Sequence, residues 1–175
     1  MQRVRSRHRF AIAAATACAG LGGLAATAAV ALPTSARITT QGLGPIKLGM
    51  TVAQVEQAGK RELAFEGGDV NADCATASLG TNVFGLFSKG RIERIDVRSR
   101  TYRTRTNIRV GDTQRKVLAS YGPSLKRSPH KYVRGGFYLK LTVGSRRLVF
   151  ETDGRRVTQV SSGNKPEIDY VEGCA

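Results

Sequence analysis

The sequence predicts an α+β protein built as a tandem repeat, in which each unit is a short helical segment packed on an antiparallel sheet. The two units are expected to share one extended sheet. Three observations lead to this prediction. The chain matches itself at an offset of 62 to 65 residues, each copy places a Thr before a helical pattern, and each copy continues into short apolar strands.

The repeated motif is clearest where each helical segment begins. Residues 46–55 read Ile-Lys-Leu-Gly-Met-Thr-Val-Ala-Gln-Val, and residues 108–117 read Ile-Arg-Val-Gly-Asp-Thr-Gln-Arg-Lys-Val. Thr51 and Thr113 are good N-caps, because a hydroxyl can accept a hydrogen bond from an amide of the first turn. Apolar residues then recur at helical spacing, and a glycine follows in each copy where the helix would end. The motif therefore predicts one short helix in each unit.

Strands follow each helical segment. The turn Ser88-Lys89-Gly90 predicts a hairpin, and Asp153-Gly154 is a strong turn signal within a meander. The predicted strands cover residues 82–87, 92–97, 137–143, 147–152 and 157–161. The chain accordingly divides into an N-terminal segment 1–36, a first repeat 37–98, and a second repeat 99–175 that includes a C-terminal tail.

The N-terminal segment has the three-part pattern of an export signal. Four arginines stand among the first nine residues, and no acid precedes Glu56. An apolar run from Phe10 to Leu32 follows, and it ends in small residues, as signal peptides do. We therefore expect the protein to be secreted or to lie in the cell envelope.

Two cleavage positions fit the small-x-small rule. One follows Ala29-Val30-Ala31 and the other follows Thr34-Ser35-Ala36, so the mature chain would begin at Leu32 or at Arg37. Two alternatives stay open. The apolar run is long enough to remain as an uncleaved membrane anchor, and a weak lipobox ending at Cys18 would allow lipidation.

Cys74 and Cys174 are the two cysteines outside this segment. Export places them in an oxidising compartment, where an isolated pair usually forms a disulfide. There is no CxxC spacing and no histidine beside either cysteine. We therefore predict a structural bridge and no metal site.

Charge is unevenly placed along the chain. The sequence holds 28 Lys and Arg against 13 Asp and Glu, a formal net charge of +15, and residues 98–134 contain eleven basic residues and a single acid, Asp112. A surface of one sign attracts polyanions and acidic partners. The candidate anion-binding or partner-binding residues are Arg98, Arg100, Arg103, Arg105, Arg109, Arg115 and Lys116. The alternative is a basic, solubilising surface with no binding role.

The first four of these arginines alternate with threonine and tyrosine. In an extended chain, Arg98 and Arg100 would share a face, and so would Arg103 and Arg105. Basic residues interleaved with aromatics are also typical of nucleic-acid binders. Export argues against nucleic acid as the natural target, and favours an anionic wall polymer, lipid headgroups or an acidic protein surface.

No catalytic constellation stands out. His130 is the one histidine beyond the N-terminal segment, and it lies beside Lys131 in a loop, where a surface role is expected. Asp69 and Asp73 are an acid pair in a Gly-rich stretch, where loop and turn roles are expected. No serine motif resembles a nucleophile elbow, and no motif indicates a cofactor or metal. We predict a protein that is not an enzyme, and a hydrolase using Asp69 or Asp73 remains an alternative.

The phrase Gly44-Pro45-Ile46-Lys47-Leu48-Gly49-Met50-Thr51, repeated weakly at residues 108–113, resembles the opening of small exported bacterial domains. These are the outer-membrane assembly lipoproteins of the SmpA/OmlA type and the tandem beta-lactamase-inhibitor-protein (BLIP-like) fold. The second half is also similar to uncharacterised secreted or lipoprotein-like bacterial proteins, at residues 129–132, 135–139, 148–154 and 170–174. The resemblance implies helical units packed on an antiparallel sheet that a tandem pair extends.

The chain departs from the inhibitor pattern in two ways. The inhibitor has a disulfide inside each repeat, whereas here one cysteine lies in each half. Its binding surface is rich in aromatics, whereas this chain has no Trp. The resemblance therefore implies a fold more than a function.

We expect an exported, non-enzymatic binding or interaction module of the bacterial cell envelope. Its basic second half would bind an anionic polymer or an acidic protein surface. The alternative is an inhibitor-like protein that docks on a secreted enzyme such as a beta-lactamase. Membrane contact is expected only if the N-terminal segment is retained or Cys18 is lipidated.

Overall fold

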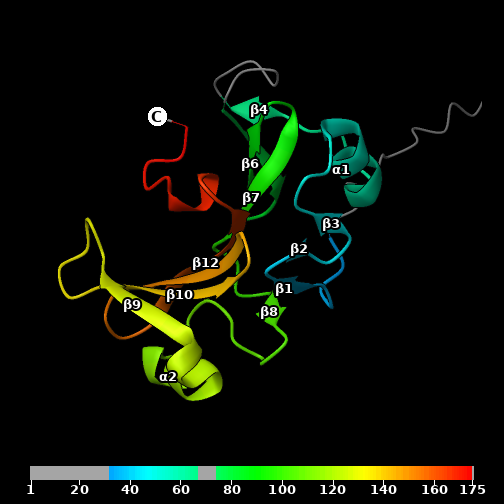
Figure 1. Cartoon of the computed structure of the whole chain (residues 1–175). Coiled ribbons are helices and arrows are strands. Elements are labelled where there is room, and N and C mark those ends of the chain that lie inside the picture. Colours follow the sequence, from blue (N-terminus) through cyan, green and yellow to red (C-terminus); the bar gives the residue numbers. More distant parts are fainter. Residues whose placement is uncertain (1–31, 67–73, 175) are drawn as a thin grey trace, which may run out of the picture.

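The computed structural model describes residues 32–66 and 74–174 (Figure 1). Most of the predicted export signal, residues 1–31 with Cys18, lies outside the described residues, and so do Asp69 and Asp73. The helices of the described part are too short and too polar to span a bilayer.

Eight antiparallel strands form the main sheet, in the order β4-β5-β6-β7-β12-β11-β10-β9. The first repeat supplies one half of this sheet and the second repeat supplies the other. The strands of the two halves meet where β7 pairs antiparallel with β12. The strands are β4 (Phe65–Glu66), β5 (Ala75–Gly80), β6 (Val83–Ser88), β7 (Arg91–Val97), β9 (Leu125–Pro129), β10 (Phe137–Val143), β11 (Arg146–Thr152) and β12 (Val157–Asn164). The predicted α+β class with a shared sheet is confirmed.

A second, smaller sheet was not predicted. Its order is β3 (Ile46–Lys47), β2 (Gly42–Leu43), β1 (Arg37–Thr39) and β8 (Arg103–Thr104). Strand β1 pairs in parallel with β8, so the start of the first repeat is hydrogen-bonded to the start of the second repeat. These strands are two or three residues long, too short to show a period in the sequence.

The two helices begin where the sequence predicts. In α1 (Val52–Gly59) the Thr51 hydroxyl accepts from the Gln54 amide, and the Gln54 side chain accepts in return from the Thr51 amide, a capping box. In α2 (Gln114–Tyr121) the Thr113 hydroxyl accepts from the Lys116 amide. Each helix has eight residues, so its stability depends on packing an apolar face rather than on propensity.

Matching hydrogen bonds show that the two motif segments are structurally equivalent. In the first repeat the Gly49 amide donates to the Ile92 carbonyl at 2.7 Å, and in the second the Gly111 amide donates to the Val157 carbonyl at 2.8 Å. Gly49 has φ +85° and Gly111 has φ +89°, which are left-handed values that favour glycine. The same backbone turn therefore opens each helix.

The hydrophobic core lies between the helices and one face of the main sheet. Phe87 and Phe150 are fully buried there. Phe65 meets the ring of Phe87 edge-on at 5.3 Å, and Tyr121 of α2 packs on Phe150 at 5.2 Å. Because side chains alternate along strands, the opposite face carries a different and more polar set.

The C-terminal tail, residues 165–174, crosses this opposite face. Figure 1 shows the tail (red) on the side of the sheet away from α1. It contains a short 3-10 turn, η2 (Glu167–Asp169), and ends at a disulfide that joins Cys174 to Cys74, with the Cα atoms 5.3 Å apart. The predicted pairing of the two cysteines is therefore present.

Candidate anion-binding site

The segment 98–105, which we call the linker, carries four of the predicted arginines and is not one extended strand. The chain bends at Arg100 and Thr101, and it is extended only over the two residues of β8. The expectation that alternate arginines share a face is therefore wrong for this segment. The physical reason is that the linker leaves the main sheet after β7 and turns to join the smaller sheet.

Arg98 lies apart from Arg103, which belongs to the smaller sheet. Arg98 is exposed on the face opposite the helices, where its Nε donates to Gln159 Oε1 at 2.7 Å and its guanidinium lies 5.6 Å from the centre of the Phe84 ring. Arg103 is half-buried in β8, and Arg105 is exposed just beyond it. Sequence proximity therefore does not keep Arg98 beside Arg103.

Lys116 and Arg109 both contact the one acid of the basic stretch. Lys116 Nζ lies 2.9 Å from Asp112 Oδ2, and the Arg109 amide donates to the same oxygen at 2.9 Å. Burial by itself raises the pKa of Asp112, but these hydrogen bonds outweigh it and hold the pKa below its ordinary value. The ionised carboxylate neutralises Lys116, which is therefore a weaker candidate than its exposure suggests.

Four arginines do gather, around the start of α2. We call them the α2 arginine cluster: Arg100, Arg115, Arg155 and Arg156. Arg156 Nη1 donates to the Gly111 carbonyl at 2.7 Å, and Arg100 lies against the same glycine, since a Cβ at Gly111 would come within 2.7 Å of Arg100 Nη2. The Gln114 amide donates to the Arg155 carbonyl at 2.8 Å, which fixes the β11–β12 turn beside the helix.

An open depression lies within this cluster. Arg115, Arg155 and Arg156 line it, together with Leu118 and Gly154. The six ion pairs found among the described residues involve none of the four arginines. The cluster is therefore a concentration of positive charge in which none of the four guanidinium groups forms an ion pair with a carboxylate of the described residues.

Asp153 shapes the turn without neutralising it. Its Oδ1 accepts from the backbone amides of Arg156 at 2.7 Å and Arg155 at 2.8 Å, an arrangement typical of an Asx turn. These two backbone hydrogen bonds lower the pKa of Asp153. The carboxylate therefore orders the backbone that presents both arginines.

The first repeat serves as an internal comparison. Arg91 occupies the position of Arg156, and Arg91 Nη1 donates to the Gly49 carbonyl at 2.8 Å, as Arg156 does to Gly111. Both arginines also form an isolated bridge to the N-cap threonine of their repeat. This arginine is therefore part of the repeated fold.

The other members of the cluster have no such counterpart. The position of Arg115 is Ala53 in the first repeat, and the position of Arg155 is Gly90. Arg100 comes from the linker. Because the first repeat folds without these charges, folding alone does not account for them.

The structure places His130 differently from the expectation of a surface residue. Its side chain is only 9% exposed, stacked on Tyr138 with ring centres 4.4 Å apart, and Nε2 lies 3.4 Å from a carboxylate oxygen of Glu151. Nδ1 accepts from the amides of Tyr132 and Val133 at 3.1 and 3.2 Å. Both ring nitrogens are therefore engaged, and His130 orders the loop after β9. Nothing in the sequence around His130 indicated this burial.

Within residues 32–66 and 74–174, no three His, Cys, Asp or Glu side chains converge so as to hold a metal ion.

Comparison with known proteins gives a distant structural likeness. No protein-family model and no curated protein matches the chain. Among solved structures, the crystal structure of the uncharacterized protein yfeY from Escherichia coli is similar with a TM-score of 0.48 and 11% identity, over 73% of this chain and 99% of that chain. No family match therefore supports the expected resemblance to the SmpA/OmlA-like and inhibitor-like groups.

Proposed function

We propose that the protein is an exported binding module of the cell envelope that holds an anionic polymer or an acidic protein surface at the α2 arginine cluster. One observation carries the proposal. Four arginines that form no ion pair among the described residues gather at the start of α2, three of them line one depression, and three of the four have no counterpart in the other repeat.

Arginine suits this role. Its planar guanidinium presents a fork of donors that matches carboxylate and phosphate groups, and several such groups together raise the local concentration of an anion. The placement of Arg115 adds a second argument. A cation in the first turn opposes the helix dipole by about 0.3–1 kcal/mol, and α2 has no acid in that turn. A bound anion would relieve this repulsion.

Two features support the envelope setting. The disulfide between Cys74 and Cys174 is typical of proteins from oxidising compartments. The basic, apolar and small-residue segments at the N-terminus follow the order of a signal peptide.

The inhibitor-like alternative draws on the shared sheet, which matches what the resemblance implies. Fold alone does not assign a function, so this alternative stays second. The SmpA/OmlA-like and BLIP-like groups remain the families that we would propose for this chain.

The test compares two triple variants that remove the same charge. R100Q/R115Q/R155Q removes three of the four charges of the cluster. It leaves Arg156, whose hydrogen bond to Gly111 recurs in the first repeat as part of the fold. K47Q/K60Q/K89Q removes three exposed lysines of the first repeat. The dissociation constant for soluble polyglutamate and for an anionic wall polymer is measured at about 0.1 M salt, where the Debye length is about 10 Å.

We expect the cluster variant to bind about tenfold more weakly than the wild type, because three exposed charges that each contribute under about 1 kcal/mol together exceed 1.4 kcal/mol. The lysine variant should bind within about twofold of the wild type. The difference should shrink at about 1 M salt, where the Debye length falls to about 3 Å. Equal weakening by both variants would show that net charge alone governs binding, and the proposal would be lost.

A further inference from the structure

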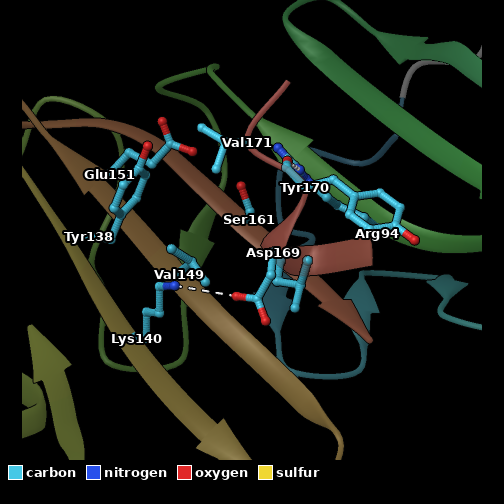
Figure 2. Close-up of a pocket in the computed structure, with 10 residues that line it drawn as sticks. Arg94, Tyr138, Lys140, Val149, Glu151, Ser161, Asp169, Tyr170 and Val171 are labelled. Atoms are coloured by element: carbon cyan, nitrogen blue, oxygen red, sulfur yellow. Dashed lines mark hydrogen bonds and ion pairs between the residues drawn. The ribbon is translucent and has the colours of Figure 1, made fainter. Parts of the chain in front are cut away.

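The face of the main sheet opposite the helices is covered by no helix, and the C-terminal tail crosses it. We call this surface the tail face. The strand register places Lys140 beside Val149, Val149 beside Ser161 and Ser161 beside Asp96, so these side chains share the face. Figure 2 shows the tail residues Asp169, Tyr170 and Val171 lying against Lys140, Val149 and Ser161. The surface is therefore broad and polar, and the tail covers only a strip of it.

Two carboxylates of the tail form ion pairs with basic side chains of the second repeat. Asp169 accepts from Lys140 Nζ at 3.3 Å, the dashed contact in Figure 2, and it also accepts from Arg147. Farther along, Glu172 accepts from Lys131 Nζ at 2.9 Å and from the Tyr132 hydroxyl. The hydrogen bonds from the Tyr132 hydroxyl and from Lys131 lower the pKa of Glu172, so that its carboxylate stays charged. Two acids three residues apart thus bind two separate basic positions.

The tail is also bound through its backbone and one apolar side chain. Arg94 is 7% exposed, and its guanidinium donates to the Tyr170 carbonyl and to Asp96. Ile168 is buried on Gly163, where a Cβ would come within 2.9 Å of the isoleucine Cδ1. The face therefore holds a turned, acidic segment through two of its carboxylates, one backbone carbonyl and the apolar side chain of Ile168.

The fit beyond that anchor is loose. Tyr170 is 40% exposed and Val171 is 45% exposed, so neither buries much apolar surface. A cavity of about 40 Å³ lies under the tail, lined by polar groups that include Tyr138 and Glu151 (Figure 2). Partly exposed ion pairs add little. The disulfide at Cys174 is therefore the strongest tether of the tail end.

From these contacts we infer that the tail face is a docking surface for a short acidic peptide segment of a partner protein that folds into turns as the tail does, and that the chain's own tail occupies it while the Cys74–Cys174 bridge is closed. The inference goes beyond the proposed function, because it concerns another face and other residues than the α2 arginine cluster. A tethered segment has an effective concentration on the order of millimolar, so a free partner competes poorly.

Opening the bridge changes that balance. A dithiol reductant supplies two electrons and two protons, is itself oxidised to a disulfide, and leaves Cys74 and Cys174 as thiols. The tail end is then held by Ile168 and by exposed ion pairs, and a partner carrying a similar acidic segment displaces it.

The test uses a fluorescein-labelled peptide with the sequence of residues 165–173, followed by anisotropy. We expect it to bind the C74S/C174S protein about tenfold more tightly than the oxidised wild type, because the end of the competing tail is no longer tethered by the disulfide and is held more weakly. K140Q/R147Q in that background should weaken binding about tenfold, since two pairs of up to about 1 kcal/mol each are lost. R134Q/R146Q removes two exposed arginines elsewhere and should change binding less than about twofold.

A second variant keeps the disulfide, so an effect on peptide binding cannot be ascribed to unfolding of a chain that lacks the bridge. In D169K/E172K the tail is repelled from its own cations, so the peptide should bind this oxidised protein more tightly than the oxidised wild type. Equal peptide binding by closed and open proteins, or equal effects of K140Q/R147Q and R134Q/R146Q, would overturn the inference. The R100Q/R115Q/R155Q variant should bind the peptide as its parent does, so failure here and failure of the proposed function are distinguishable.

Discussion

Removing the disulfide should cost a large part of the stability of this domain. The bridge joins residues that are 100 positions apart, so it closes most of the folded chain into one loop. In the chain-entropy model a loop of that length lowers the entropy of the unfolded chain by about 16 cal/mol/K, which is about 4.7 kcal/mol at 25 °C. Domains of ordinary size have about 5–15 kcal/mol in all.

The effect arises chiefly in the unfolded state. Ile168 and the sheet beneath it keep their contacts when both cysteines become serine, and the ion pairs of the tail end are too exposed to add much. The C74S/C174S chain should therefore lose about 3–5 kcal/mol of unfolding free energy. Its dependence on denaturant should become steeper, because an unfolded chain without the cross-link exposes more surface.

Urea unfolding followed by circular dichroism measures both quantities on the oxidised wild type and on C74S/C174S. A thiol titration of the unfolded wild type first establishes that Cys74 and Cys174 are both oxidised. A loss below about 1 kcal/mol with an unchanged denaturant slope would refute the reasoning, because it would mean that the bridge does not restrict the unfolded chain.

Two further predictions concern the chain start and the β11–β12 turn. If the export signal is removed, the mature chain should begin at Leu32 and not at Arg37, because Leu32 is 4% exposed and its carbonyl lies 3.4 Å from the Tyr102 hydroxyl. N-terminal sequencing of the exported protein checks this, and a start at Arg37 would contradict it. Asp153→Asn should lower the unfolding free energy by about 1 kcal/mol at pH 7, since a charged acceptor of two amides is lost. The pKa of Asp153 is lowered from 3.8, so the deficit should be present above about pH 4 and vanish as the pH falls through the folded-state pKa. Urea midpoints from neutral to acidic pH test this, and a deficit that grew on acidification would be inconsistent with it.

Much of the main sheet was predictable because local signals and tertiary pairing agree there. The predicted strand 137–143 has the bounds of β10, and the predicted 82–87 and 147–152 each differ from β6 and β11 by one residue at one or both ends. The reason is that Gly and Asp residues mark the turns while apolar residues alternate between them. The caps at Thr51 and Thr113 are equally local, since each acts on an amide three residues away.

Other strands depend on partners that the sequence does not reveal. Strand β5 reads Ala-Thr-Ala-Ser-Leu-Gly, which has weak β propensity, and it forms because β6 lies beside it. Strand β9 reads Leu-Lys-Arg-Ser-Pro and lies at the edge of the sheet, where charge and proline are tolerated. The smaller sheet brings β1 and β8 together across more than sixty residues.

The candidate site was predictable only in part for a related reason. Arg100 and Arg115 were among the predicted residues, but Arg155 and Arg156 lie about forty positions later in a turn. The repeat held the missing signal. Arg155 and Arg156 are the repeat equivalents of Gly90 and Arg91. Arg91 pairs with the N-cap residue Thr51, and in the same way Arg156 pairs with the N-cap residue Thr113.

The tandem architecture also determines where a partner of the tail face would extend. Helices cover one face of each repeat, so joining β7 to β12 makes the uncovered faces continuous across eight strands. The tail crosses only part of that surface. Beyond it, Phe84 and Arg98 line a further depression with Glu172 on its rim. A partner segment longer than the tail would therefore continue over β6, and its next acidic residue would meet Arg98.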